Sequence, residues 1–193
     1  MTRFDDDRRY LVEFMDHADV RCPKCDCKAA VTRRTEASAA RVVCSSCPFA
    51  ASIEETGWLG PMRGLVRRRC GMCGQWLERR LSGPRPPRVA HLACTCGFEF
   101  DEDVIMERVI NGPVDPVFGL ELWLTALFRN ELVWAYNVEH LRFLREFVGA
   151  DIRERVPNQN SSLASRLPRW MKAAKNRTAL LAVINGLEDR ADT

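Results

Sequence analysis

The chain has 193 residues, of which 46% are hydrophobic and 28% charged, with a formal net charge of +3. This composition is that of a globular protein and excludes the disordered and fibrous classes, and so small a net charge indicates no partner by itself. No apolar run approaches the roughly 18 residues that a membrane-spanning helix needs, and residues 1–7 lack the basic-then-apolar layout of a secretory signal. We therefore expect a cytoplasmic protein with no membrane partner.

The first twenty residues contain six acids and three arginines and predict one short helix. Residues 10–15, Tyr-Leu-Val-Glu-Phe-Met, supply its apolar side chains, and an aspartate before them is the expected N-cap. We expect this helix to pack on the module that follows it.

Nine cysteines lie between residues 22 and 96, and their spacing indicates two metal sites. In a reducing compartment, closely spaced cysteines are more often metal ligands than disulfide partners, and an odd count fits two sets of four with one left over. A C-x-x-C turn brings two sulfurs to about 2.3 Å from one zinc ion. The sequence therefore predicts two structural Zn²⁺ ions, the first held by Cys22, Cys25, Cys44 and Cys47 and the second by Cys70, Cys73, Cys94 and Cys96.

Each set of four predicts a small β-hairpin module. In the first, residues 30–34 and 40–43 are the expected strands, with a turn at 36–38 and a third strand at 49–54. In the second, residues 75–80 and 88–93 are the expected hairpin strands, joined by a tip at 82–87 that is rich in glycine and proline. Gly71, Gly74 and Gly97 are suited to the positive φ angles of the metal-binding turns.

Cys27 is the cysteine left over. It is either a free thiol or an alternative to Cys25 in the first site, and the symmetry of the two C-x-x-C pairs favours the free thiol. His17 and His91 are interpreted as ordinary surface residues, because four sulfurs already complete each site.

The second half of the chain has no cysteine and shows helical patterns. Residues 101–118 are interpreted as a short helix or strand followed by a linker. Residues 118–136 are dense enough in apolar side chains for a buried hairpin or a helix pair, between which the periodicity does not decide. An amphipathic helix is predicted at 138–156, ended by Pro157. Residues 160–162 can cap a short turn, Pro168 suits the start of a further helix, and 178–187 is the last helix.

The expected fold is α+β: two small tandem β zinc ribbons followed by a mainly α unit. The expected domains are residues 1–57, with the N-terminal segment and first ribbon, 58–103, with the second ribbon, and 104–193, with a linker and the helical domain.

Two regions are strongly basic. Residues 58–100 contain eight arginines against two glutamates, with aromatic residues among them, and residues 165–177 contain five cations and no acid. Arginine forks bind phosphates and exposed aromatic rings stack on bases, so both regions are candidate nucleic-acid contacts. A structural interpretation also stays open, in which the arginines only balance the thiolate charge and Trp170 is a core residue. The candidate contacts are Arg67, Arg68, Arg69, Trp76, Arg79, Arg80, Arg85, Arg88, Arg169 and Lys172.

The segments Arg21-Cys22-Pro23-Lys24-Cys25 and Val43-Cys44-Ser45-Ser46-Cys47 resemble the zinc ribbons of the transcription-factor-IIB type. The resemblance covers about residues 20–100 as a twofold ribbon, and the whole chain is similar to bacterial proteins that join such ribbons to a helical tail. It implies a module that binds nucleic acid or docks onto a polymerase-like assembly. In that comparison residues 118–136 would be a third ribbon-like hairpin, with Ala126 and Asn130 at the positions of lost cysteines.

No catalytic motif accompanies these modules: the chain has no phosphate-binding loop, no nucleophile elbow and no deaminase signature. We therefore expect a non-catalytic protein with no small-molecule substrate. The first hypothesis is a nucleic-acid-binding protein, and the alternative is an adaptor that docks onto a larger bacterial protein assembly.

Overall fold

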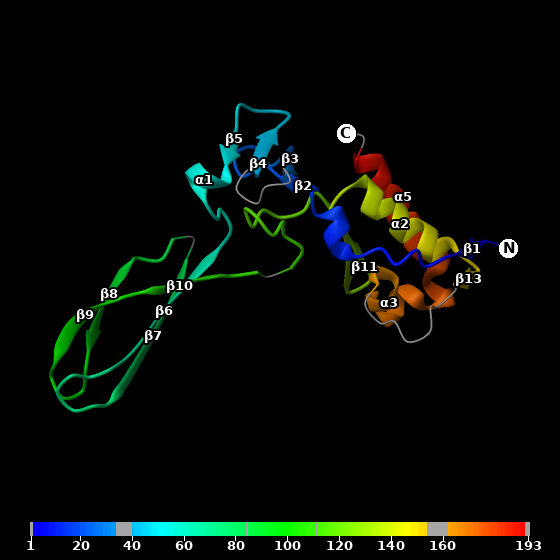
Figure 1. Cartoon of the computed structure of the whole chain (residues 1–193). Helices are drawn as coiled ribbons and strands as arrows, with labels where there is room; N and C mark the ends of the chain where they lie inside the picture. Colours follow the sequence, from blue (N-terminus) through cyan, green and yellow to red (C-terminus); the bar gives the residue numbers. More distant parts are fainter. Residues whose placement is uncertain (1, 34–39, 84, 111, 154–161, 192–193) are drawn as a thin grey trace. The chain divides into compact units, whose positions relative to one another are not determined.

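The computed structural model describes residues 2–33, 40–83, 85–110, 112–153 and 162–191. The chain forms two compact units (Figure 1). Unit 1 combines Met1–Gly57 with Pro113–Thr193, and unit 2 is Trp58–Gly112. The predicted turn at 36–38, the predicted helix end at Pro157, the capping residues 160–161 and Pro84 of the predicted tip lie outside the described residues.

The first cysteine set belongs to an antiparallel sheet in the order β2-β3-β4-β5. Its strands are β2 (His17–Arg21), β3 (Lys28–Thr32), β4 (Arg41–Cys44) and β5 (Ala50–Ser52), and β5 is followed by the short helix α1 (Ile53–Thr56). Val20, Val31 and Val42 are almost fully buried, so one face of the sheet forms a core. The predicted strands of this module are thus present, with a short helix where residues 53–54 were expected to extend the third one.

Residues 118–136 form a β-hairpin and not a helix pair. It consists of β11 (Leu124–Phe128) and β12 (Glu131–Ala135), paired from Leu124↔Ala135 to Phe128↔Glu131. The helices of this part of unit 1 follow the hairpin: α2 (Val138–Gly149), α3 (Leu163–Arg166), α4 (Arg169–Lys172), the 3-10 turn η2 (Ala174–Asn176) and α5 (Arg177–Ala191). Leu141, Leu144, Leu180 and Ile184 of α2 and α5 are buried between them.

Backbone hydrogen bonds join the hairpin and helices to the first sheet. Val20 and Leu122 form an antiparallel bridge, and the N–H of Trp123 donates to the carbonyl of Asp19 at 2.9 Å. Residues 121–123 thereby cover the outer edge of β2. The predicted C-terminal domain therefore does not stand apart from the first sheet, because the edge strand β2 needs a partner for its backbone groups.

The N-terminal segment also belongs to this core. The 3-10 helix η1 (Leu11–Phe14) is capped by Glu13, whose carboxylate accepts from the N–H of Tyr10 at 2.7 Å, and not by an aspartate. Phe14 stacks on His140 of α2 with ring centroids 4.8 Å apart. The predicted short helix is present, but it packs against α2, because its one buried aromatic side chain meets the aromatic cluster there.

The predicted helix at 138–156 ends earlier, at Gly149. Asp151 accepts from the N–H of Thr2 at 3.0 Å, and β13 (Ile152–Arg153) pairs in parallel with β1 (Arg3–Phe4). Residues 152–153 therefore pair with the N-terminal strand and do not continue the helix. Ile152, expected on the apolar helix face, is 43% exposed.

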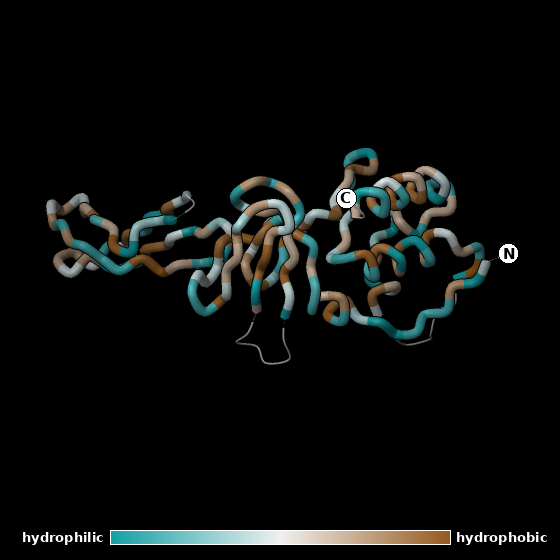
Figure 2. The backbone as a smooth tube through the Cα atoms, turned by 90° about the horizontal axis from the view of Figure 1, so that it is seen from above, coloured by the Kyte–Doolittle hydropathy of each residue, from teal (hydrophilic) through white to brown (hydrophobic). Residues whose placement is uncertain are grey.

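Apolar residues occur in short stretches along the chain, interrupted by polar ones (Figure 2). Among the described residues, no helix combines the length and the apolar character needed to cross a membrane.

Unit 2 consists of a three-stranded antiparallel sheet, in the order β10-β6-β7, and a separate hairpin, β8-β9. The strands are β6 (Met62–Arg69), β7 (Trp76–Gly83), β8 (Val89–Ala93), β9 (Glu99–Asp103) and β10 (Ile105–Arg108). The hairpin packs on one face of the sheet around Val66, Ala90, Leu92 and Val104. Strand β10 extends this unit beyond the predicted boundary at residue 103.

The predicted hairpin between residues 75–80 and 88–93 is wrong. Strand β7 pairs with β6, from Met62↔Gly83 to Arg69↔Trp76, and β8 pairs with β9. Residues 62–69 were not recognised as a strand because arginines occupy four of their eight positions. Arg63, Arg67 and Arg69 lie on the exposed face of this strand, while Gly64 and Val66 are buried on the other face.

Gly64 allows the hairpin to approach the sheet closely. A Cβ atom at this position would lie 2.6 Å from Cγ1 of Val104, a side chain that is stiff at χ1. We expect Gly64→Ala to destabilise unit 2 by about 1–3 kcal/mol through overpacking. Denaturant unfolding should show a lower midpoint. Gly71→Ala, whose Cβ would meet nothing nearer than 3.8 Å, is the control; an equal loss in both variants would contradict the prediction.

Candidate metal centres and a basic sheet face

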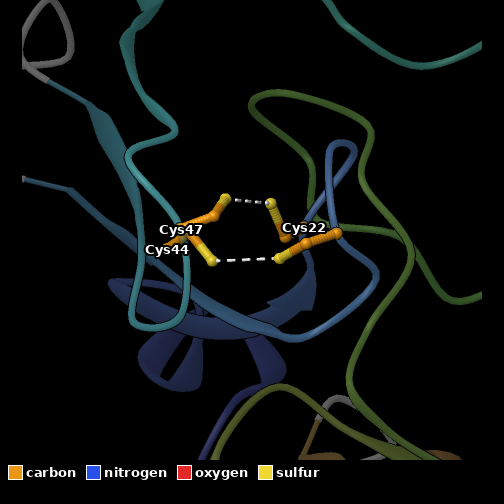
Figure 3. A group of neighbouring side chains, drawn as sticks. Cys22, Cys44 and Cys47 are labelled. Atoms are coloured by element: carbon orange, nitrogen blue, oxygen red, sulfur yellow. Dashed lines mark hydrogen bonds between the residues drawn. The ribbon is translucent and has the colours of Figure 1, made fainter.

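The eight predicted cysteine ligands come together in the two predicted groups of four. The Sγ atoms of Cys22, Cys25, Cys44 and Cys47 all lie within 4.8 Å of one another, and so do those of Cys70, Cys73, Cys94 and Cys96. In Figure 3 the turns that carry the first group face each other, with the sulfurs between them. Each group can hold one metal ion.

The sulfur spacings fit a tetrahedral ion and not a disulfide. They are 3.7 Å for Cys22–Cys47 and 3.6 Å for Cys25–Cys44. The second group gives 3.6 Å for Cys70–Cys96 and 3.5 Å for Cys73–Cys94. A disulfide bond is about 2.05 Å long, whereas metal–sulfur bonds of about 2.3 Å in a tetrahedron separate the sulfurs by about 3.8 Å.

The cysteine pairs share one backbone pattern, which explains the C-x-C spacing of the last pair. The N–H of the first cysteine donates to a carbonyl five residues later in three turns: Cys22 to Cys27, Cys44 to Phe49 and Cys70 to Gln75, at 2.8–2.9 Å. In the fourth turn the N–H of Cys94 donates to Phe98, four residues later, at 2.8 Å. The turn is one residue shorter and is still closed by the same kind of bond.

Hydrogen bonds from the backbone prepare some of these thiols to bind a cation. An N–H donor from Ser46 lowers the pKa of Cys44 to about 7, and one from Cys73 lowers the pKa of Cys70 to about 6. For Cys47 a donor from Phe49 also lowers the pKa, but burial and the neighbouring sulfurs outweigh it and raise the pKa to about 12. The thiolates therefore oppose one another's ionisation, and a divalent cation among them removes that opposition.

Cys27 lies outside both groups. Its half-buried thiol donates to the carbonyl of Cys25 at 3.5 Å. His17 contacts Asp19 at 3.2 Å and His91 contacts Asp101 at 3.0 Å, so neither histidine belongs to a cysteine group.

In three of the four cysteine turns the residue that follows the second cysteine has a positive φ angle. Gly74 and Gly97 have φ angles of 73° and 88°, as expected for two of the three predicted glycines, and the corresponding residue of the first turn is Asp26, with φ 59°. We expect Asp26→Gly to stabilise unit 1 by about 0.5–1 kcal/mol, because glycine adopts this conformation without steric cost. Asp26→Ala is the control, since it removes the same exposed ion pair with Arg21 but keeps the Cβ. A melting temperature of Asp26→Gly below that of the wild type would contradict the prediction.

The strand register of unit 2 sorts the predicted arginines onto two faces of its sheet, because residues opposite each other in an antiparallel pair share a face. Arg67 lies opposite Glu78, Arg69 opposite Trp76, and Leu65 opposite both Arg80 and Ile105. We call the sheet face turned away from the β8-β9 hairpin the basic face. Its residues are Arg63, Leu65, Arg67, Arg69, Trp76, Glu78, Arg80, Ser82, Ile105 and Glu107.

Trp76 is the aromatic centre of the basic face. It is 52% exposed, and the guanidinium carbons of Arg67 and Arg69 lie 5.1 and 4.7 Å from its ring centroid. Glu78 forms ion pairs with Arg80 at 2.9 Å and Arg67 at 4.0 Å. Arg69, in contrast, contacts Trp76 and forms no ion pair with any described residue.

Arg68 and Arg79, which were also predicted to contact phosphates, lie on the opposite face of the sheet and bind the β8-β9 hairpin. Arg68 forms an ion pair with Glu102, and Arg79 donates to the carbonyl of His91 at 2.7 Å. Their charges hold the two layers of unit 2 together.

The outer face of the β8-β9 hairpin is acidic. We call it the acidic face; it carries Glu99, Asp101 and Asp103, opposite Ala93, His91 and Val89. His91 contacts both Asp101 and Glu99, and the hydrogen bond with Asp101 is the main cause that raises its pKa. Unit 2 therefore has opposite charges on its two outer faces.

The remaining predicted contacts lie elsewhere. Arg85 and Arg88 are exposed in the connection between β7 and β8. Arg169 and Lys172 belong to α4 of unit 1, where Lys172 donates to the carbonyl of Ser165 at 2.7 Å. Trp170 of the same helix stacks on Phe128 with centroids 5.8 Å apart.

The net charge of unit 2 is smaller than that of residues 58–100 alone. Residues 58–112 hold nine arginines and six acids, a balance of +3, because β9 and β10 add four acids and one arginine. A four-thiolate site with a divalent ion lowers this balance by two. The separation of charge between the faces, and not the total, is therefore the electrostatic feature of this unit.

Comparison with models of protein families, with curated proteins and with solved structures finds no match to this chain.

Proposed function

We propose that this is a non-catalytic protein of the zinc-ribbon class that binds nucleic acid through the basic face of unit 2. The observation that carries the proposal is the exposed Trp76 with Arg67 and Arg69 at its ring, in a unit where three of the six acids, Glu99, Asp101 and Asp103, lie on the acidic face of the other layer. A polarised module of this kind orients itself toward a polyanion even when its net charge is small.

Zinc is the metal we propose for both cysteine groups. A tetrahedral set of four sulfurs selects zinc or iron among the common metals, and four thiolates leave no open position for water or substrate. The ions are then structural, and the ribbons serve as rigid supports for the residues at their surface. A reducing cytoplasm is the compartment that keeps these thiols available to the metal.

Single-stranded nucleic acid is the form that the basic face favours. A base that stacks on Trp76 must have a free face, which duplexes do not offer. The guanidinium groups of Arg67 and Arg69 lie over the same ring, and we propose that they turn to the adjoining phosphates when a base binds. Stacking of one base contributes about 1–3 kcal/mol, so Trp76 and the arginines act together.

The test is binding of a labelled mixed-sequence single strand, compared with its duplex, over a range of salt concentrations. We expect the double variant Arg67→Gln/Arg69→Gln to bind at least tenfold more weakly. The slope of log K against log salt should fall by about 1.4, since each phosphate contact contributes about 0.7 for a single strand. Trp76→Leu should weaken binding with little change in the slope, because it removes stacking and no charge.

The matched control is Arg85→Gln/Arg88→Gln, which removes the same two charges from the same unit but outside the basic face. If both double variants weakened binding equally, the loss would come from the lower net charge of the unit and not from the basic face. Binding that is absent, or insensitive to salt in the wild type, would contradict the proposal.

A second candidate is an adaptor that docks onto a protein assembly. It is favoured by the position of β7 and β10 at the edges of their sheet and by Ile105, which is 61% exposed. An edge strand can pair with a strand of another protein. Purification of a stoichiometric protein partner, with a ratio of absorbance at 260 to 280 nm that excludes nucleic acid, would favour this candidate over the first.

A further inference from the structure

A cavity of about 220 Å³ lies inside unit 1, apart from the cysteine group. It is bounded by strand β12, helix α2, the helices α3 and α4 and their connection, and Leu11 of η1. Most of its lining is apolar, and the aromatic walls are fixed by neighbours: Trp170 stacks on Phe128, and Trp134 meets His140 edge-on with centroids 5.6 Å apart. An apolar cavity of about 150 Å³ is known to hold a benzene ring, so this one has room for a ring with a short side chain.

Among the described residues of the lining, and apart from the indole nitrogens, His140 and Arg166 carry the polar side-chain groups that suit a ligand. His140 is 2% exposed, and its Nδ1 accepts from the N–H of Tyr136 at 3.3 Å. Burial, with a smaller effect of Arg9, lowers the pKa of His140 to about 4. The ring is therefore neutral near pH 7, and its proton is on Nε2, which makes that nitrogen a donor.

Arg166 is exposed at the cavity and is also a donor only. Among the described residues no acid forms an ion pair with it. Both polar groups thus offer hydrogens, and no acid is among the described residues that line the cavity, so none of them offsets the charge of Arg166. An occupant that complements this wall has an apolar body and an anionic group that accepts hydrogen bonds.

We propose that this cavity binds a small monocarboxylic acid with an apolar, ring-sized body, whose carboxylate pairs with Arg166 and whose body lies between Trp134 and Trp170. Neither the zinc ions nor nucleic acid takes part, so the site is independent of the function proposed above.

The five tryptophans make the test direct in the wild-type protein. Their indole N–H signals in a ¹H–¹⁵N spectrum, assigned with single Trp→Phe variants, are followed while 4-phenylbutyrate is added. We expect saturable shifts of Trp134 and Trp170, which line the cavity, and none of Trp58 and Trp76, which belong to unit 2. The alcohol 4-phenylbutan-1-ol has the same body without the charge and should bind at least tenfold more weakly.

Two variants complete the experiment. Arg166→Gln should weaken binding of the acid at least fivefold and leave that of the alcohol unchanged, while Leu167→Trp, which places a larger side chain in the lining, should weaken both. Absence of saturable shifts at millimolar acid, equal binding of acid and alcohol, or shifts spread over all five tryptophans would overturn the proposal. The wild-type titration decides this even if the Leu167→Trp variant does not fold.

Discussion

Replacing Cys70 by serine is expected to remove one of two bound metal ions and to unfold unit 2, while unit 1 stays folded. Among the described residues of unit 2, the buried apolar side chains other than cysteines are Val66, Pro86, Ala90, Leu92 and Val104. So small a core cannot offset the conformational entropy of about fifty ordered residues. The free energy of metal binding must supply the difference.

Replacing Cys22 should have a milder effect on the structure. The first sheet also loses its metal ion, but its edge strand β2 remains bonded to residues 121–123. Helices α2 and α5 keep a core that includes Leu141, Leu144 and Ile184. We therefore expect loss of the C-x-x-C turns without loss of the helices. Chelation of both ions should give the sum of these effects and leave the helices in place.

The measurements are metal content by elemental analysis and hydrogen exchange resolved by peptide. Wild-type protein should contain two ions per chain, and each serine variant one. Exchange protection should vanish across 58–112 in Cys70→Ser and be kept across α2 and α5. Cys27→Ser is the control and should retain both ions, because its sulfur lies outside both groups. A wild type with no tightly held metal, or Cys27→Ser with one ion, would contradict the assignment of the ligands.

The cysteine groups could be predicted from the sequence because their geometry is local. A C-x-x-C turn fixes the positions of its two sulfurs by itself, and a hairpin brings a second pair back. The same argument predicted the free Cys27, since Cys25 and not Cys27 repeats the spacing of the second pair. The C-x-C pair, Cys94 and Cys96, also belongs to its predicted group. Its turn is one residue shorter than the C-x-x-C turns and is closed by a hydrogen bond from Cys94 to Phe98, four residues later and not five.

The faces of unit 2 could not be predicted in the same way. Sorting Arg67 and Arg69 from Arg68 requires knowing that residues 62–69 form a strand, and their charges conceal the alternation that marks one. Asp101, Glu102 and Asp103 of β9 were likewise assigned to the start of a short helix or strand that precedes a linker, and not to a hairpin. The one charged side chain that β6 turns toward the hairpin, Arg68, pairs with Glu102 across the layers, a contact between residues far apart in the sequence.

The union of the first ribbon with the C-terminal helices is also a long-range property. Asn137 caps α2 by accepting from the N–H of His140 at 2.9 Å, and its side-chain amide donates to the carbonyls of Phe14 and His17. The cap could be predicted from the residue type, but the second pair of bonds could not. This one side chain ties the N-terminal helix, the first sheet and α2 to each other.

Asp115 is the second site where a large effect is expected. Its side chain is fully buried. Its Oδ1 accepts from the N–H groups of Val117 and Phe118 at 2.9 and 2.8 Å, and its Oδ2 accepts from that of Leu120 at 2.7 Å. These bonds fold the loop that delivers Leu122 to the edge of β2. Burial raises the pKa of Asp115, and the three donors oppose that rise.

We expect Asp115→Ala to destabilise unit 1 by about 3 kcal/mol or more, because three buried N–H groups lose their acceptor and each costs about 1–3 kcal/mol. We expect Asp115→Asn to lower the free energy of unfolding by about half as much as Asp115→Ala. Its amide oxygen can still accept from Val117 and Phe118, but its NH₂ group faces the N–H of Leu120. The exposed Asp103→Ala is the control and should change stability by less than about 0.5 kcal/mol.

Hydrogen exchange of the peptide that spans 113–122, together with denaturant unfolding followed by tryptophan fluorescence, measures the effect. Loss of protection should begin in this loop and spread to β2, since Val20 depends on Leu122 for its edge pairing. If Asp115→Ala instead kept the exchange pattern of the wild type, the loop would be held by the packing of Phe118 and not by the carboxylate. The ribbon would then owe its attachment to the helices to apolar contact alone.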